Sequence, residues 1–189
     1  AQAARTIDPV VRDTQGYIDK LKSRIPGYSQ TLEARPNFWG EPIIMSGGLG
    51  PDIVSPIYSS FSNNDPVSNE LVRLKYSPSM PQRSIDGVRI PPDLYNKFVR
   101  RAGKLAYSIL EEYVVSNPEY RKLDKLPSTQ VTEIKKVIEK TRAAASVILR
   151  IEMGMVFREK DANVLRDIRK SDPEAFENLN IPEKYKKNL

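Results

Sequence analysis

Apolar residues recur every three or four positions in three separate stretches of the chain, which is the spacing of one face of an α-helix. The three stretches are 8–25, 92–115 and 129–152. Asp8 is a suitable N-cap for the first, and Pro9 occupies the first helical position, where its missing N–H costs nothing. Ser128 is the expected cap of the last stretch. The pattern therefore predicts three longer helices.

Shorter elements are predicted from pairs of residues that begin a helix or form a tight turn. A cap followed by proline recurs at Asp65-Pro66, Asn117-Pro118 and Asp172-Pro173, and each pair predicts a short helix. Asp86-Gly87 lies between alternating apolar residues, which predicts a small β-hairpin. The predicted fold class is mainly α: three longer helices with a small β-hairpin and a long ordered extended arm.

The arm is the stretch 28–64, where frequent proline and glycine break any regular pattern. It nevertheless contains large apolar side chains, which a disordered linker would lack. We expect an ordered arm that lies along neighbouring subunits, because a body of this size leaves little room to bury it. Aromatic side chains often dominate interfaces. The predicted interface anchors are Trp39, Ile57, Tyr58 and Phe61, and a homo-oligomer or a partner-bound state is expected.

These elements divide the chain into four parts. They are an N-terminal helix in 1–27, the Pro/Gly-rich arm with a short helix and a hairpin in 28–91, a helical body in 92–160, and short helices with a tail in 161–189. We expect the tail, residues 181–189, to be ordered only when it is held. The chain opens with Ala1 rather than methionine, which favours a piece of a longer polypeptide.

The composition excludes several kinds of catalytic and metal-binding group. The chain has no cysteine and no histidine, which removes thiolate nucleophiles, sulfur-bound zinc and the commonest general base at neutral pH. We expect no catalytic residue, no cofactor and no metal site. No apolar run reaches the ~20 residues that cross a bilayer, so no membrane-spanning segment is expected.

Two local patterns are weak candidates for sites. Gly47-Gly48-Leu49-Gly50 is followed by Pro51 and Asp52 rather than by lysine and a hydroxyl residue, which favours a plain turn over a phosphate loop. Glu41 beside Trp39 is a candidate acid only if Asp52 or Asp65 faces it across a cleft. The favoured interpretation is that Trp39 fills a pocket while Glu41 accepts backbone N–H bonds, so a carboxylate hydrolase is the least favoured function.

The net positive charge leaves open an alternative function, the binding of nucleic acid. Lysine and arginine outnumber acidic residues by 30 to 24, a net charge of +6. Several charged residues fall on the face of the 129–152 helix opposite its apolar stripe: Lys135, Lys136, Glu139, Lys140 and Arg142. Weakly paired, solvated side chains are the favoured interpretation. A nucleic-acid-binding module that contacts DNA is the alternative.

A series of short sequence segments, taken in order along the chain, resembles a known family of proteins. The series runs Asp8-Pro-Val-Val-Arg-Asp-Thr, Leu21-Lys-Ser-Arg-Ile-Pro-Gly-Tyr-Ser-Gln-Thr-Leu32, Trp39-Gly-Glu-Pro42, Gly48-Leu-Gly, Ser55-Pro-Ile-Tyr58, Asp65-Pro-Val, Asn69-Glu-Leu, Met80-Pro, Ile85-Asp-Gly-Val, Leu94-Tyr95 and Ala102-Gly103. Over about residues 8–152 it resembles a region near the C-terminus of large polyvalent proteins of phages and prophages, some of which are similar to internal virion or DNA-ejection proteins. The resemblance implies a structural, non-catalytic component of the virion that binds portal, tail or other particle proteins, or copies of itself. It carries no site residues.

Overall fold

The computed structural model describes residues 10–13, 30, 32, 34–43, 65–123, 126–187 and 189. These residues form the helices α3 (Pro66–Arg73), α4 (Pro92–Ser116), α5 (Pro118–Lys122), α6 (Pro127–Glu152), α7 (Glu159–Ser171), α8 (Pro173–Asn178) and α9 (Glu183–Lys186), with one hairpin of β1 (Ser84–Ile85) and β2 (Val88–Arg89). The prediction of a mainly α fold with a small β-hairpin is confirmed.

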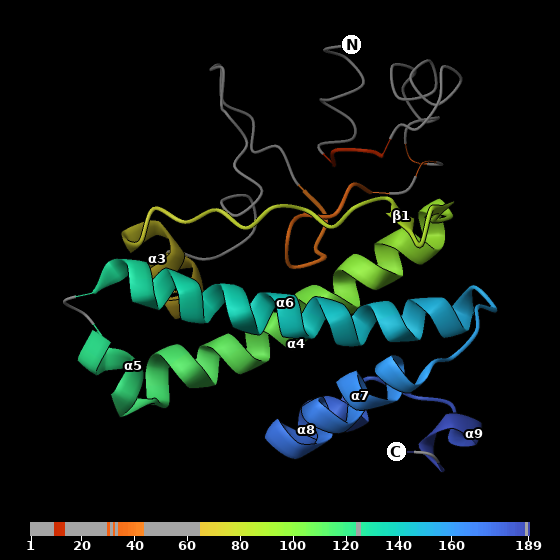
Figure 1. Cartoon of the computed structure of the whole chain (residues 1–189). Helices are drawn as coiled ribbons and strands as arrows, with labels where there is room; N and C mark the ends of the chain where they lie inside the picture. The colour runs from red at the N-terminus through yellow and green to blue at the C-terminus, as the bar shows by residue number, and fades with distance from the viewer. Residues whose placement is uncertain are drawn as a thin grey trace.

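Helices α4 and α6 lie side by side and form the centre of the molecule (Figure 1). They run antiparallel, since α5 joins the end of α4 to the start of α6 and Arg101 in the first half of α4 pairs with Glu152 at the end of α6. Each helix turns a continuous apolar stripe toward the other, as the helical spacing predicts. Buried residues of the two stripes include Ala102, Leu105, Leu110, Ile134, Ile138, Ala145 and Ile148.

Other segments cover two sides of this pair. Helices α7 and α8 lie on one side, below α6 in Figure 1, and pack Leu165, Ile168 and Phe176 against Ile148 and its neighbours. On the other side lie α3, the extended segment that leads from α3 to β1, and residues 34–43. The core therefore consists of helical layers closed on one side by extended chain.

Local signals predict most of the short elements. Asp65 caps α3 through bonds from the backbone N–H groups of Val67 and Ser68, and Asp172 caps α8 through a bond from Ala175. The hairpin turns at Asp86 and Gly87, both with positive φ, as a two-residue turn requires.

The start of α6 differs from the prediction. Helix α6 begins at Pro127 with Leu126 as its N-cap residue, so Ser128 lies inside the first turn and is not the cap. Proline is favoured at the first helical position because it lacks the N–H that would have no partner there.

The N-terminal helix predicted over 8–25 is wrong at residues 10–13, and its other residues lie outside the described part of the chain. Val11 donates its backbone N–H to the Ile43 carbonyl and accepts from the Arg35 N–H, at 2.8 and 2.7 Å. Arg12 forms an antiparallel bridge with Ala34. Pairing with a distant segment takes the backbone groups that a helix would use, and it outweighs the local signal of Asp8 and Pro9.

The predicted C-terminal tail is held by the chain itself. Ile181 is buried with the residues of α7 and α8, and the Tyr185 ring lies 4.9 Å from the ring of Phe157. In the described part of the chain, no helix combines the length and the apolar character needed to cross a bilayer.

Candidate functional site: the Trp39 cradle

Residues 34–43 form a tight turn with its own internal hydrogen bonds. Asn37 and Glu41 close it: the Asn37 N–H donates to the Glu41 carbonyl at 2.7 Å, and the Glu41 N–H donates to Asn37 Oδ1 at 2.9 Å. Gly40 lies between them with φ +84°, a conformation that few other residues adopt at low cost. Pro36 and Pro42 form a bridge below the turn. We call residues 10–13 and 34–43 together the arm unit.

The turn presents two aromatic side chains to the helices. Trp39 is 2% exposed and Phe38 is 4% exposed, and both belong to the core that α3, α4 and α6 build. The Trp39 ring meets the Tyr107 ring edge-on at 5.4 Å. Edge-on aromatic pairs of this kind add to the stabilisation from burial alone.

Two glycines allow the backbone of the turn to lie very close to the backbone of α4. A Cβ atom added at Gly103 would lie 2.5 Å from the Trp39 carbonyl carbon, and one added at Gly40 would lie 2.2 Å from the Arg100 Cα. Neither backbone atom can move away as a flexible side chain would. The contact therefore depends on the absence of a side chain at both positions, one on each partner.

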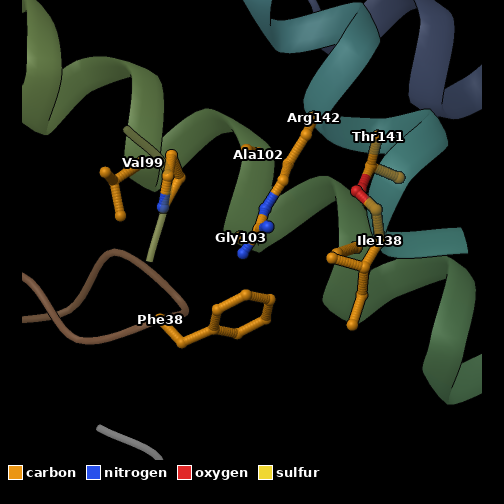
Figure 2. A pocket seen from close by; sticks show the side chains of 9 residues that line it. Phe38, Val99, Ala102, Gly103, Ile138, Thr141 and Arg142 are labelled. Atoms are coloured by element: carbon orange, nitrogen blue, oxygen red, sulfur yellow. The ribbon is translucent and has the colours of Figure 1, made fainter. Parts of the chain in front are cut away.

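Phe38 fills the space beside this contact (Figure 2). Its ring extends from the turn toward Gly103 and the α6 residues Ile138 and Arg142, and the space around it admits no water molecule. The Arg142 guanidinium lies 5.3 Å from the ring centroid and also donates to the Ser79 carbonyl. Burial lowers the pKa of Arg142. We call the surface that receives the turn the cradle; its residues are Arg100, Gly103, Ala106, Tyr107, Ile138 and Arg142.

Trp39, which was predicted both as an interface anchor and as a side chain that fills a pocket, takes the second role here. Its side chain is buried within the chain's own core, so in this arrangement it is not an anchor offered to a partner. The assumption that the body has no room for the arm is wrong for residues 38 and 39, because the glycine contact lets the backbone come close enough to α4. Ile57, Tyr58 and Phe61 lie outside the described residues.

The candidate carboxylates have structural partners. Asn37 Nδ2 donates to Glu41 Oε2 at 3.4 Å, beside the backbone bond that joins these two residues. Asp65 accepts from the Tyr107 hydroxyl at 2.7 Å and from the first N–H groups of α3. Burial and this bond raise the pKa of Tyr107. Asp52 and the segment 47–50 lie outside the described residues.

The charged residues of α6 contact groups of the same chain. Lys136 pairs with Glu133 at 2.7 Å, Lys140 donates to Ser171 Oγ at 2.8 Å, and Lys135 lies over the Tyr76 ring. Arg142 was expected on the solvated face and lies instead against Phe38. Among the residues that the structure describes, no group of three or more acidic side chains is placed to hold a metal ion.

Sequence reasoning missed the glycines and Phe38. One signal was available: Gly103 is an isolated glycine in the middle of a predicted helix, where it costs stability relative to alanine and can have a packing reason. Comparison of the chain with family models, with curated proteins and with solved structures found no match in any of the three.

Proposed function

We propose that this chain is a structural assembly segment of a bacteriophage virion, a non-catalytic part of an internal, ejection or portal-associated protein. Its partners would be other particle proteins or copies of itself. The ordered series of segments described above suggests the phage context, and the contact between the arm unit and α4 suggests how such a segment would work.

The observation that supports an assembly role is the burial of Trp39 against Gly103. It fixes one point of a Pro/Gly-rich arm on a helical body, so that the rest of the arm starts from a defined place. A rigid body that fixes the start of an arm reduces the conformational entropy lost when the arm binds. That property suits a protein whose task is to join neighbours.

In this proposal the apolar residues farther along the arm supply the contacts with the partner. Ile57, Tyr58 and Phe61 are the proposed anchors because tyrosine and other large apolar side chains supply much of the binding energy in interfaces. Because the residues that would bind DNA on α6 contact other groups of the chain, the nucleic-acid alternative receives less support.

The mass of the purified chain, measured by light scattering at low and high salt, tests the proposal. We expect an oligomer whose mass does not change with salt, because apolar contacts are screened little by ions. Tyr58→Ser should reduce the mass, whereas the matched control Val156→Ser, at an exposed apolar side chain in the α6–α7 connection, should not. Mass spectrometry of purified particles should then detect peptides of the chain.

A monomer at both salt concentrations, with no trace of the chain in purified particles, would refute an assembly role. Binding to duplex DNA that weakens steeply as salt rises would favour the nucleic-acid alternative instead.

A further inference from the structure

The arm unit is organised independently of the helices on which it rests. The bonds between Asn37 and Glu41, the bridge of Pro36 with Pro42 and the pairing of Val11 with Arg35 and Ile43 all lie within it. These bonds stay within the arm unit wherever it docks, because none of them involves the cradle. Such a segment can occupy the same cradle whether that cradle belongs to its own chain or to another copy.

The contact with the cradle is noncovalent and concentrated in two side chains. Phe38 and Trp39 are nearly fully buried in it, and polar contacts lie beside them: Arg100 Nε donates to the Gly40 carbonyl at 3.4 Å, and Arg83 pairs with Asp13 at 2.9 Å. Aromatic anchors at the centre of a patch with polar contacts at its rim are the usual arrangement of an interface between separate molecules.

The connection between the arm unit and the body is long. About 20 residues, 44–64, join Ile43 to Asp65, and such a stretch can span at most about 70 Å. A connection of that length can reach the cradle of a copy that lies against this one. Two copies that exchange arm units lose no contact, because each cradle is filled in the exchanged pair as it is in the single chain.

We propose that the cradle also binds the arm unit of a second copy of this chain, so that assembled copies are joined by exchanged arms. The short-range contacts would be the same in both states, and the choice between them would depend on the local concentration of copies. The inference rests on the proposed assembly role and adds the surface through which copies recognise each other.

The chain allows a direct test because Trp39 is its only tryptophan. One variant, Gly103→Ala, retains Trp39 but has a blocked cradle. The other, Trp39→Ala, has an open cradle and no tryptophan. When the two are mixed, Trp39 can be buried only in the cradle of the other chain. We expect a blue shift of tryptophan emission on mixing, together with a doubling of the mass of the fluorescent species.

The matched control replaces the second chain with one that carries both Trp39→Ala and Gly103→Ala, which should produce no shift. Emission that is the same before and after mixing, with no complex of the two chains, would overturn the exchange. Particle incorporation of the unaltered chain would then still support the proposed function, so the two ideas fail separately.

A second measurement needs no change at Gly103 and applies if that variant does not fold. A tagged, otherwise unaltered chain on beads should retain an untagged unaltered chain after incubation. The retained amount should fall several-fold when both chains carry Trp39→Ala, and should not fall when both carry Val88→Ala at an exposed position of the hairpin. Equal retention in all three pairs would show that copies associate without the arm unit and would overturn the proposal.

Discussion

At the scale of single residues, Asp65 links the start of a helix to the Trp39 site. Its carboxylate accepts from two backbone N–H groups of α3 and from the Tyr107 hydroxyl, and the Tyr107 ring in turn contacts Trp39. A buried carboxylate is stable only when such donors replace water. The side chain that starts α3 therefore also orients the ring that holds the arm.

Tyr107→Phe should lower the free energy of unfolding by about 1.5–3 kcal/mol, because it removes a hydrogen bond to a charged group and keeps the ring. Urea unfolding followed by circular dichroism measures the change. Tyr113→Phe is the matched control on the same helix, since no hydrogen bond of the Tyr113 hydroxyl is among the described contacts; it should change stability by less than about 0.5 kcal/mol. Equal losses in the two variants would contradict the role given to Asp65.

At the scale of elements, the three Asp-Pro pairs show what a sequence can and cannot reveal. At Asp65 and Asp172 the pair begins a helix, because backbone N–H groups within the next three residues donate to each carboxylate. Asp8-Pro9 has the same local pattern, yet residues 10–13 pair with residues more than 20 positions away. Local bonds can be predicted from a sequence, whereas a distant competitor for the same backbone groups cannot.

The same limit applies to the candidate site. The pattern predicts that Trp39 is buried in some pocket, because tryptophan is large and apolar. It does not reveal that the pocket lies on α4, since that depends on Gly103 and Gly40, whose close approach to the opposite backbone appears only when the chain is folded.

A second network joins α3, α5 and α6. Glu70 accepts from Arg73 at 2.6 and 2.8 Å and from the Tyr120 hydroxyl, and Arg73 also donates to Gln130 of α6 at 2.7 Å. The hydrogen bonds from Arg73 lower the pKa of Glu70 below its ordinary value of 4.5, against the opposing effect of burial. The carboxylate is thus favoured in its charged form by the folded state.

Glu70→Gln should destabilise the protein at neutral pH and much less in acid. Because the pKa of Glu70 is lower in the folded chain than in the unfolded one, its contribution is complete above about pH 4.5 and is lost as the pH falls through the folded value. Urea unfolding at a series of pH values should show the two curves converging in acid. Glu119→Gln, which alters an exposed pair with Lys122, is the control and should leave the pH profile unchanged. Parallel curves for wild type and Glu70→Gln would refute this role.

At the scale of the whole molecule, Arg150 connects three parts that are distant in the sequence. From α6 it donates to Asp161 of α7 at 3.0 Å and to Asp86 in the hairpin turn at 3.1 Å. Asp161 is 2% exposed and accepts one further bond, from the Arg158 N–H. One guanidinium thus joins both α7 and the hairpin to α6.

Arg150→Ala should lower the free energy of unfolding by roughly 3 kcal/mol, because it leaves a buried carboxylate without its cation. It should also increase hydrogen exchange in both α7 and the hairpin, which a purely local role would not do. Arg166→Ala is the matched control. Arg166 pairs with Glu159, which lies on the same helix and is mostly exposed, and a loss below about 1 kcal/mol is expected. Faster exchange in α7 alone would show that Arg150 does not connect the parts.

The glycine at position 103 also links the arm to the stability of α4. Glycine in the middle of a helix costs about 1 kcal/mol relative to alanine, and here it lies near the midpoint of the 25-residue α4. With the arm in place, Trp39 covers that weak turn. Alanine at 103 would therefore favour the helix by itself and at the same time exclude the arm. The stability of α4 and the docking of the arm thus place opposite demands on one position.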